Sequence, residues 1–121
     1  MRYMFLIYSQ ETADGLSPDH AESVKTRHWA VMQDSHHRGI LKAVEGLKPT
    51  STATTVRMND GQAITSDGPF AETKEQLAGY YILECRDLDE AIEWAKRIPS
   101  ACKGGDGCIE IRPVADLPQR P

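Results

Sequence analysis

The run Asp67–Glu75, DGPFAETKE, holds the densest group of chemically useful side chains in the sequence. The carboxylate of Asp67 precedes a Gly-Pro turn, and Glu72 and Lys74 follow within the same run. A carboxylate at the mouth of a cleft can accept a proton or a substrate N–H. It can equally cap its own turn by accepting a backbone N–H two residues on. We interpret the run as the rim of a pocket and leave both roles open for Asp67.

The charged pair of Glu72 and Lys74 has two interpretations. In an extended segment the two side chains share a face and could grip a polar substrate, whereas in a helical turn they diverge. The alternative is a solvated turn without a ligand, which we favour for Glu75. Phe70, between Asp67 and this pair, is interpreted as an anchor that buries the loop rather than a platform for stacking.

His28 falls on an apolar stripe of a predicted helix, four residues after Val24 and three before Val31. A histidine in this position is either a core residue with satisfied hydrogen bonds or a group that moves protons near neutral pH. If the first helix packs close to the Asp67 loop, His28 and Asp67 form a catalytic acid–base pair. Both interpretations of His28 remain open.

Three further side chains on predicted strands could contribute to the same cleft. Arg57 and Arg112 are opposite in phase to the apolar positions of their strands. They face solvent or, in a closed barrel, point inward and bind a carboxylate bidentately. Tyr8, at the end of the first strand, could supply a hydroxyl as a substrate-binding group.

Several common chemistries have no motif in this chain. We find no GxxxxGK[ST], GxGxxG, nucleophile elbow or HExxH. His36 and His37 are adjacent and point apart on a helix, so they do not form an i, i+4 metal pair. We therefore expect no metal ion and no cofactor. The glycine-rich run 104–107 is interpreted as a loop before the last strand.

The three cysteines, Cys85, Cys102 and Cys108, have no CxxC spacing. An odd number without a pairing pattern favours a reducing compartment, and we expect a cytoplasmic protein. We interpret all three as small buried hydrophobes or loop thiols rather than catalytic groups, because no activating neighbourhood can be read from the sequence.

Length and composition predict one ordinary globular domain. The chain has 121 residues, 40% hydrophobic and 26% charged, with a net charge of −4. This charge gives no electrostatic reason to expect nucleic acid or an anionic membrane as a partner. No apolar run approaches the roughly 20 residues that span a bilayer. The apolar stretch 3–8 is interpreted as a central strand covered on both faces, not as a signal peptide.

The predicted elements alternate between strands and helices. Ser17 before Pro18 predicts a helix start, and Gly39 a stop after about Arg38. The D-x-x-E arrangement at 87–90 begins a second helix, with Leu88, Ala91, Ile92, Ala95 and Ile98 on one face. The expected strands are 3–8, 40–47, 51–58, 62–66, 77–85 and 109–112, with a hairpin turn at 59–61.

This order favours an α+β, ferredoxin-like sandwich, an antiparallel sheet with two helices on one face. The helices leave the second face of the sheet bare, although the central strands are apolar throughout. Two sheets packed face to face in a homodimer would cover it. We assign residues 1–114 to the domain and 115–121 to a C-terminal tail.

The sequence resembles the DGPF branch of the YCII-related proteins. The resemblance rests on DGPFAETKEQLAGYYILE, DLDEAIEWA, IEIRPV, the opening YMFLIY and the segment TVRMNDGQAITSDGPF. It covers roughly residues 1–114. It implies a bacterial protein whose ferredoxin-like subunit pairs into a dimeric α/β barrel.

The resemblance also implies a function. Relatives in the wider group have a His and an Asp proposed as an acid/base pair in a cleft, and Asp67 matches the motif's Asp. His28 is the candidate for the His from its helical position. Arg112 matches the family's RPV ending and is the better arginine to hold an anionic ligand, together with Lys74. The leading hypothesis is proton transfer on a small polar metabolite. The alternative is a non-catalytic regulatory or ligand-sensing module associated with an extracytoplasmic-function sigma factor, as the family's gene neighbourhoods suggest.

Overall fold

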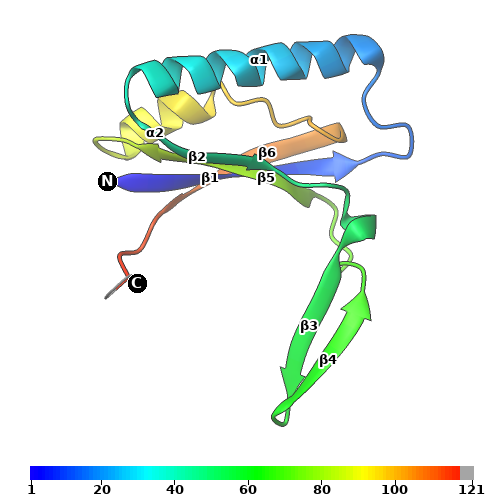
Figure 1. The fold of residues 1–121 in the computed structure, drawn as a ribbon. Helices are drawn as coiled ribbons and strands as arrows, with labels where there is room; N and C mark the ends of the chain where they lie inside the picture. The colour runs from blue at the N-terminus through cyan, green and yellow to red at the C-terminus, as the bar shows by residue number, and fades with distance from the viewer. Residues whose placement is uncertain (118–121) are drawn as a thin grey trace.

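The computed structural model describes residues 1–117 and contains two helices above an antiparallel sheet, with a separate hairpin below it (Figure 1). The elements in chain order are β1 (Arg2–Glu11), α1 (Pro18–His37), β2 (Leu41–Gly46), the 3-10 turn η1 (Thr50–Thr52), β3 (Thr54–Asn59), β4 (Gln62–Asp67), β5 (Gln76–Glu84), α2 (Leu88–Ala95) and β6 (Gly104–Pro113). Residues 118–121 of the predicted tail lie outside the described residues.

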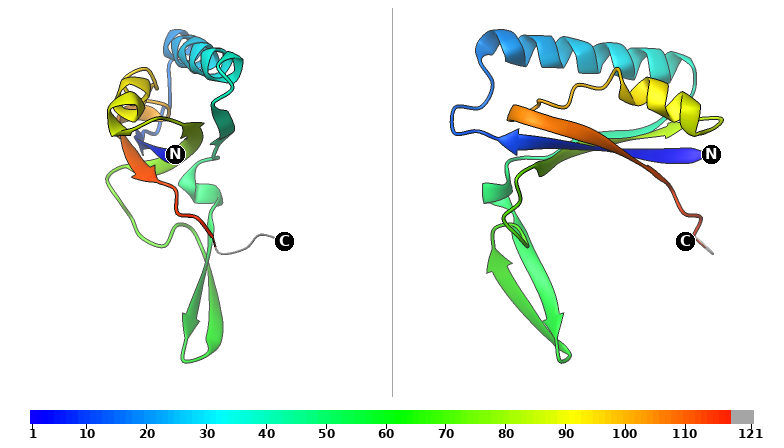
Figure 2. Two further views of the ribbon diagram at one scale, coloured as in Figure 1. Left: turned by 90° about the vertical axis from the view of Figure 1, so that its left-hand side faces the viewer. Right: turned by 180° about the vertical axis from the view of Figure 1, so that it is seen from behind.

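The main sheet has four strands in the order β2-β5-β1-β6, and all its pairings are antiparallel. Both helices cover the same face of this sheet (Figure 2). With the β3–β4 hairpin set aside as an insertion between β2 and β5, the chain reads strand, helix, two strands, helix, strand. The predicted ferredoxin-like α+β fold is confirmed.

Strand β1 shows how the sheet divides its residues between two faces. Tyr3, Phe5 and Ile7 are buried beneath the helices, and Phe5 is 0% exposed. The alternate residues Met4 and Leu6 are only half-buried, because they lie on the face that the helices leave open. The expectation that this strand is covered on both faces is therefore not met within one chain.

Helix α1 begins and ends where its caps predict. The Ser17 side chain accepts a hydrogen bond from the His20 backbone N–H at 3.2 Å. Gly39, just after the C-cap, has φ +74°, a left-handed conformation that glycine adopts without strain. Val31 and Ser35 form the buried face of the helix, and the Ser35 hydroxyl donates a hydrogen bond to the Val31 carbonyl oxygen at 2.7 Å.

Helix α2 buries most of its predicted face, because Ala91 and Ile98 lie in the core and Ala95 packs against it, but Ile92 is 37% exposed. Asp87 caps it as expected, accepting from the Glu90 N–H at 3.0 Å. Trp94, not assigned to the apolar face, is buried with Ala91, whereas Leu88 is 52% exposed. Because Arg97 stacks on the Trp94 ring at 4.6 Å and Trp94 packs inward, the tryptophan rather than Leu88 sets the buried side of this helix.

The β3–β4 hairpin projects away from the sheet on the side opposite the helices (Figure 1). Its turn is the predicted one, with positive φ at both Asp60 (+51°) and Gly61 (+80°), as a type I′ turn requires. All residues of its two strands except Thr55 are exposed. A two-stranded hairpin alone is only marginally stable in water, so this one has little support from its own chain.

The glycine run 104–107 was predicted as a loop, and this prediction is wrong. Strand β6 begins at Gly104, and Gly107 pairs with Ser9 of β1. A Cβ at Gly107 would lie 1.8 Å from the Tyr8 carbonyl oxygen, so glycine is needed for the close approach of the two strands. Within residues 1–117, neither helix is long and apolar enough to cross a membrane.

Candidate functional site

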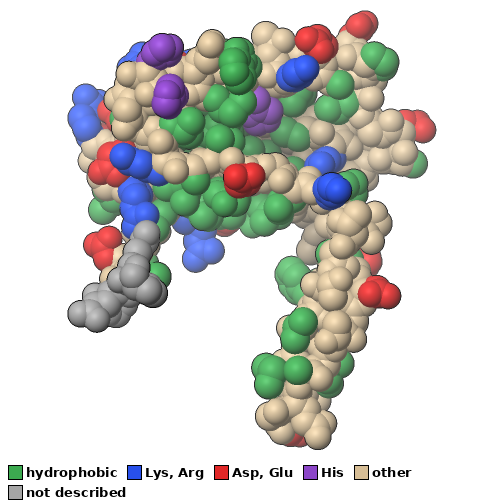
Figure 3. Space-filling view, in the orientation of Figure 1, with side chains coloured by type: hydrophobic (Ala, Val, Ile, Leu, Met, Phe, Trp, Pro, Cys, Tyr) green, Lys and Arg blue, Asp and Glu red, His purple; other side chains and the backbone are tan. Residues whose placement is uncertain are grey.

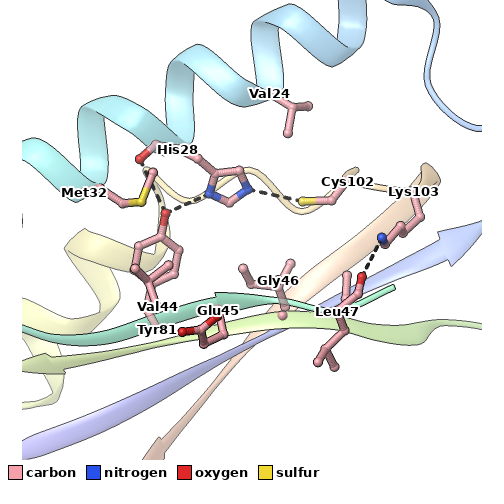
Figure 4. A pocket seen from close by; sticks show the side chains of 13 residues that line it. Val24, His28, Met32, Val44, Glu45, Gly46, Leu47, Tyr81, Cys102 and Lys103 are labelled. Carbon is pink, nitrogen blue, oxygen red and sulfur yellow. Dashed lines mark hydrogen bonds between the residues drawn. The ribbon is translucent and has the colours of Figure 1, made fainter. Parts of the chain in front are cut away.

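A cavity of about 370 Å³ lies between α1 and the helix-covered face of the sheet, and His28 forms part of its wall (Figure 4). Helix α1, strands β2 and β5 and the loop before β6 all contribute to the wall. Most of the lining is apolar. The residues are Ile7, Val24, His28, Met32, Val44, Glu45, Gly46, Leu47, Ala78, Gly79, Tyr81, Cys102 and Lys103.

His28 is held at both ring nitrogens. Its Nδ1 lies 2.8 Å from the Tyr81 hydroxyl, and its Nε2 lies 3.4 Å from the Cys102 Sγ. The His28 and Tyr81 rings are stacked, with centroids 5.8 Å apart. Because α1, β5 and the loop before β6 each supply one of these groups, only the assembled fold fixes the imidazole.

Burial shifts the ionisation of all three groups toward their neutral forms. Burial lowers the pKa of His28, and the nearby Arg27 lowers it further. Burial raises the pKa of Tyr81 and that of the Cys102 thiol, although Lys103 and Arg27 oppose the rise at Cys102. At neutral pH the imidazole is therefore largely uncharged and able to accept a proton.

Lys103 gives the cavity a cation. Its Nζ donates to the Leu47 backbone carbonyl at 2.8 Å, and the side chain forms no ion pair with a carboxylate of residues 1–117. The carbonyl fixes the ammonium group without cancelling its charge. Glu45, on β2, supplies the opposite charge to the wall of the same cavity.

Asp67 is the last residue of β4 and lies on the projecting hairpin, away from His28 (Figure 1). Its side chain is exposed and makes no hydrogen bond or ion pair with the described part of the chain, residues 1–117. The bond that closes the turn is instead made by the backbone, from the Gly68 N–H to the Ala53 carbonyl at 2.8 Å. The turn-capping role considered for Asp67 is thus absent from this structure.

A second cavity, of about 380 Å³, lies where the hairpin meets the sheet, and the DGPF run forms one wall of it. Pro69 and Phe70 are in this wall, whereas Asp67, Glu72 and Lys74 are not. The Phe70 ring is 71% exposed, which is contrary to its interpretation as a buried anchor. The only ionisable side chain among the lining residues is Lys48, so this cavity has no acid–base pair of its own.

The remaining predicted residues separate into two groups. Glu72 and Lys74 are exposed in the loop between β4 and β5. Tyr8 and Arg112 lie on the open face of the sheet but four residues apart along it, because Arg112 pairs in register with Met4 and Tyr8 with Cys108. Burial, followed by the charge of Glu110, raises the pKa of Tyr8, so its hydroxyl stays protonated.

Within one chain, then, Tyr8 and Arg112 share a face of the sheet, but neither lines the cavity that contains His28. The residues that do surround His28, above all Tyr81 and Cys102, were not candidates. Tyr81 read as an ordinary strand residue and Cys102 as a loop thiol. Since 74 residues separate His28 from Cys102, local spacing carries no signal of their contact.

Among residues 1–117, no group of three or more His, Cys, Asp or Glu side chains is arranged to hold a metal ion. Cys85, Cys102 and Cys108 are all free thiols.

The comparisons with known proteins agree on the family. The model of the YCII-related domain matches residues 1–118. The chain belongs to the YCII-related family. It is also 40% identical to an uncharacterised protein of Rhizobium meliloti (strain 1021) over 116 residues, which cover 95% of this chain and 93% of that protein. This YCII-related chain therefore shares nearly its whole length with a relative whose name assigns no activity.

Proposed function

We propose that this YCII-related protein binds a small organic molecule in the cavity between α1 and the sheet, and that His28 transfers a proton to or from it. The observation that carries the proposal is the fixed, largely neutral imidazole at the wall of a 370 Å³ cavity, with both ring nitrogens in contact. A general base must be held within reach of the substrate and be unprotonated at working pH. His28 meets the second condition because burial lowers its pKa.

The cavity wall favours a particular kind of ligand. Val24, Met32 and Val44 offer an apolar surface, and the Lys103 ammonium offers an unneutralised positive charge. A small molecule with an apolar body and a carboxylate matches both features, because the carboxylate can accept charge-assisted hydrogen bonds from Lys103. Glu45 adds a site for an N–H or ammonium group on the same ligand.

A second part of the proposal concerns assembly, and we infer that two copies form a homodimer. The open face of the sheet carries half-buried apolar side chains, including Leu6, Tyr80 and Ile82. The hairpin exposes Val56 (61%) and Met58 (68%). Hydrophobic side chains line the underside of the sheet and the side of the hairpin toward it (Figure 3). If each hairpin lies under the sheet of the other copy, one two-fold contact covers both surfaces.

The exposed carboxylate of Asp67 and the exposed Glu72 and Lys74 are proposed as contacts of this assembly or of a ligand at its edge. Tyr8 and Arg112 would then lie at the interface between copies. The regulatory alternative, a module bound to an extracytoplasmic-function sigma factor, would use the same exposed hairpin. Co-purification of a sigma factor with the wild-type chain, lost when Val56 and Met58 are replaced by Asp, would favour that alternative over the homodimer.

Thermal unfolding in the presence of small carboxylic acids tests the binding site. At least one acid should raise the Tm of the wild type and of Asp67→Asn, and the rise should shrink in Lys103→Met. A rise that survives in Lys103→Met but disappears in Asp67→Asn would place the ligand at the DGPF loop and overturn the proposal. So would a panel in which no acid raises the Tm.

Proton transfer needs its own measurement. Exchange of an acidic C–H of the bound acid for deuterium can be followed by NMR in D₂O. We expect exchange catalysed by the wild type and about 100-fold slower exchange with His28→Gln, the lower end of what a general base contributes. Equal rates would show that His28 only packs against the ligand.

A further inference from the structure

His28, on α1, and Cys102, in the loop before β6, make a polar contact at the wall of the cavity. The Cys102 Sγ lies 3.4 Å from the His28 Nε2, within hydrogen-bonding distance for sulfur, and also 3.3 Å from the Pro99 carbonyl oxygen. Figure 4 shows the thiol and the imidazole side by side at the wall of the cavity. Cys102 is half-buried, whereas Cys85 is 2% exposed and lies in the core.

One arrangement of hydrogens satisfies the contacts between His28 and Tyr81, and it leaves the single thiol hydrogen of Cys102 shared between the His28 Nε2 and the Pro99 carbonyl oxygen. The Tyr81 hydroxyl donates to the His28 carbonyl oxygen at 3.5 Å, and its oxygen accepts the Nδ1–H at 2.8 Å. The Nε2 then has no hydrogen and its lone pair points at the thiol. This order, a group that orients a histidine that faces a thiol, is the arrangement that activates nucleophilic cysteines.

We propose that Cys102 is a nucleophile, with His28 as its general base and Tyr81 as the residue that positions His28. The site would take a small carbon electrophile of the α,β-unsaturated carbonyl class. This inference rests on the proposed binding of a small molecule in the same cavity, and it adds the reacting atom and the class of substrate.

The step balances without an additional reagent. The Sγ attacks the β-carbon and forms the S–C bond, while its proton passes to the His28 Nε2. The electron pair of the C=C bond moves to the α-carbon, which takes the proton back from Nε2. A thioether and a neutral imidazole result, with no oxidant and no leaving group.

The charged and titratable groups around the pair suit a base-assisted reaction. The cations Arg27 on α1 and Lys103 in the loop lower the Cys102 pKa, although burial raises it overall. Tyr81 on β5 and Glu45 on β2 complete the set that faces the cavity. A thiol with a raised pKa is a weak nucleophile at neutral pH unless a neighbouring base removes its proton, so the reaction depends on His28.

Acrylamide, a small neutral member of the substrate class, tests the inference on the full chain. Mass spectrometry of peptides gives the rate of addition at each cysteine, and exposed Cys108 serves as the internal reference. At pH 7, Cys102 should react faster than Cys108. His28→Gln should slow Cys102 about 100-fold and leave Cys108 unchanged. Equal rates at Cys102 in the wild type and His28→Gln would overturn the proposal.

The pH profile separates a base from a merely structural histidine. Because the pKa of His28 lies below its ordinary value of 6.5, its basic form predominates at pH 7 and gains little more at higher pH. The wild-type rate at Cys102 should level off there, whereas the His28→Gln rate should keep rising toward pH 9 as the thiol ionises. A wild-type profile without levelling would contradict the assignment. Tyr81→Phe, which keeps the ring, should slow Cys102 about tenfold and supplies the test if His28→Gln fails to fold.

Cys102→Ser distinguishes this inference from the proposed function. It removes the nucleophile and keeps His28 and the cavity. If Cys102→Ser retains the rise in Tm with a carboxylic acid while wild-type Cys102 does not react with acrylamide, binding stands and the nucleophile assignment is overturned. If wild-type Cys102 reacts as expected and no acid binds, the proposed ligand class fails instead.

Discussion

Side chains on the two sides of the sheet differ in how far their own chain buries them and supplies their hydrogen bonds. On the helix side, Phe5 and Leu83 are 0% exposed, and the polar groups of His28 and Tyr81 bind one another. On the other side, the hairpin exposes Val56 and Met58, and the Asp67 side chain makes no hydrogen bond or ion pair among residues 1–117. Within one chain, the helix side is buried and the hairpin side is exposed. The difference explains why we propose ligand chemistry at His28 and assembly through the hairpin.

The largest expected effect is on the free energy of unfolding, which should depend on the helix side of the sheet far more than on the hairpin side. Phe5→Ala should lower the free energy of unfolding by about 3–5 kcal/mol, because it deletes a fully buried ring from the core. Phe70→Ala removes the same atoms from a ring that is 71% exposed. Measured by urea unfolding at a concentration where the chain is monomeric, it should change stability by no more than about 0.5 kcal/mol. Similar losses in the two variants would break the comparison.

Replacing Val56 and Met58 together by Asp tests whether the exposed hairpin forms the proposed dimer contact. Covering these two side chains is worth about 3–6 kcal/mol, so the double variant should weaken dimerisation at least about 100-fold in analytical ultracentrifugation. Ser66→Asp places a charge on the other face of the hairpin, since Ser66 pairs with Thr55, and serves as the control. A wild-type chain that is monomeric at high concentration would remove the basis for this half of the comparison.

The pH dependence of stability sharpens the helix side. The folded-state pKa of His28 lies below its unfolded value of 6.5, so between the two values the unfolded chain binds more protons. The stability tied to neutral His28 is therefore present above pH 6.5 and lost as the pH falls through the lowered pKa. The difference in unfolding free energy between the wild type and His28→Gln should be constant above about pH 7, and the wild type should lose stability relative to the variant as the pH falls below 6.5. Parallel pH curves would show that burial does not perturb His28.

Asp67→Asn should have the smallest effect on stability. The Asp67 side chain makes no hydrogen bond or ion pair within residues 1–117, so its free energy of unfolding should change by less than about 0.5 kcal/mol. Loss of an N-cap or turn cap would instead cost about 1 kcal/mol. A loss of that size in thermal unfolding would mean that Asp67 stabilises its turn and that its side chain bonds to its own chain.

Local signals predicted the elements well. The Ser17 cap, the Gly39 stop and the Asn-Asp-Gly turn at 59–61 each act through backbone groups a few residues away, so their effect can be read from neighbours. The orientation of α2 could not be read in this way. Ala91 and Ile98 of its predicted stripe are buried, but Trp94 joins them in the core and Leu88 does not, which spacing within the helix could not show.

The candidate site was predicted only in its separate parts. The helical stripe identified His28, and the acidic turn identified Asp67. Their proposed pairing depended on where the hairpin would lie, and the structure sends the hairpin away from α1 (Figure 1). Instead of Asp67, Tyr81 and Cys102 contact the two nitrogens of the imidazole. Strand β5 positions Tyr81, and the loop before β6 positions Cys102.

The sequence by itself determined the order of strands and helices, the family and the presence of an apolar surface larger than one chain can bury. These follow from periodicity, capping residues and motif, which are properties of neighbouring positions. Only the tertiary structure decided which side chains meet His28, because contacts across 53 and 74 residues depend on sheet order and helix packing. Burial in that packing raises the pKa of both Tyr81 and Cys102, which no local pattern could have shown.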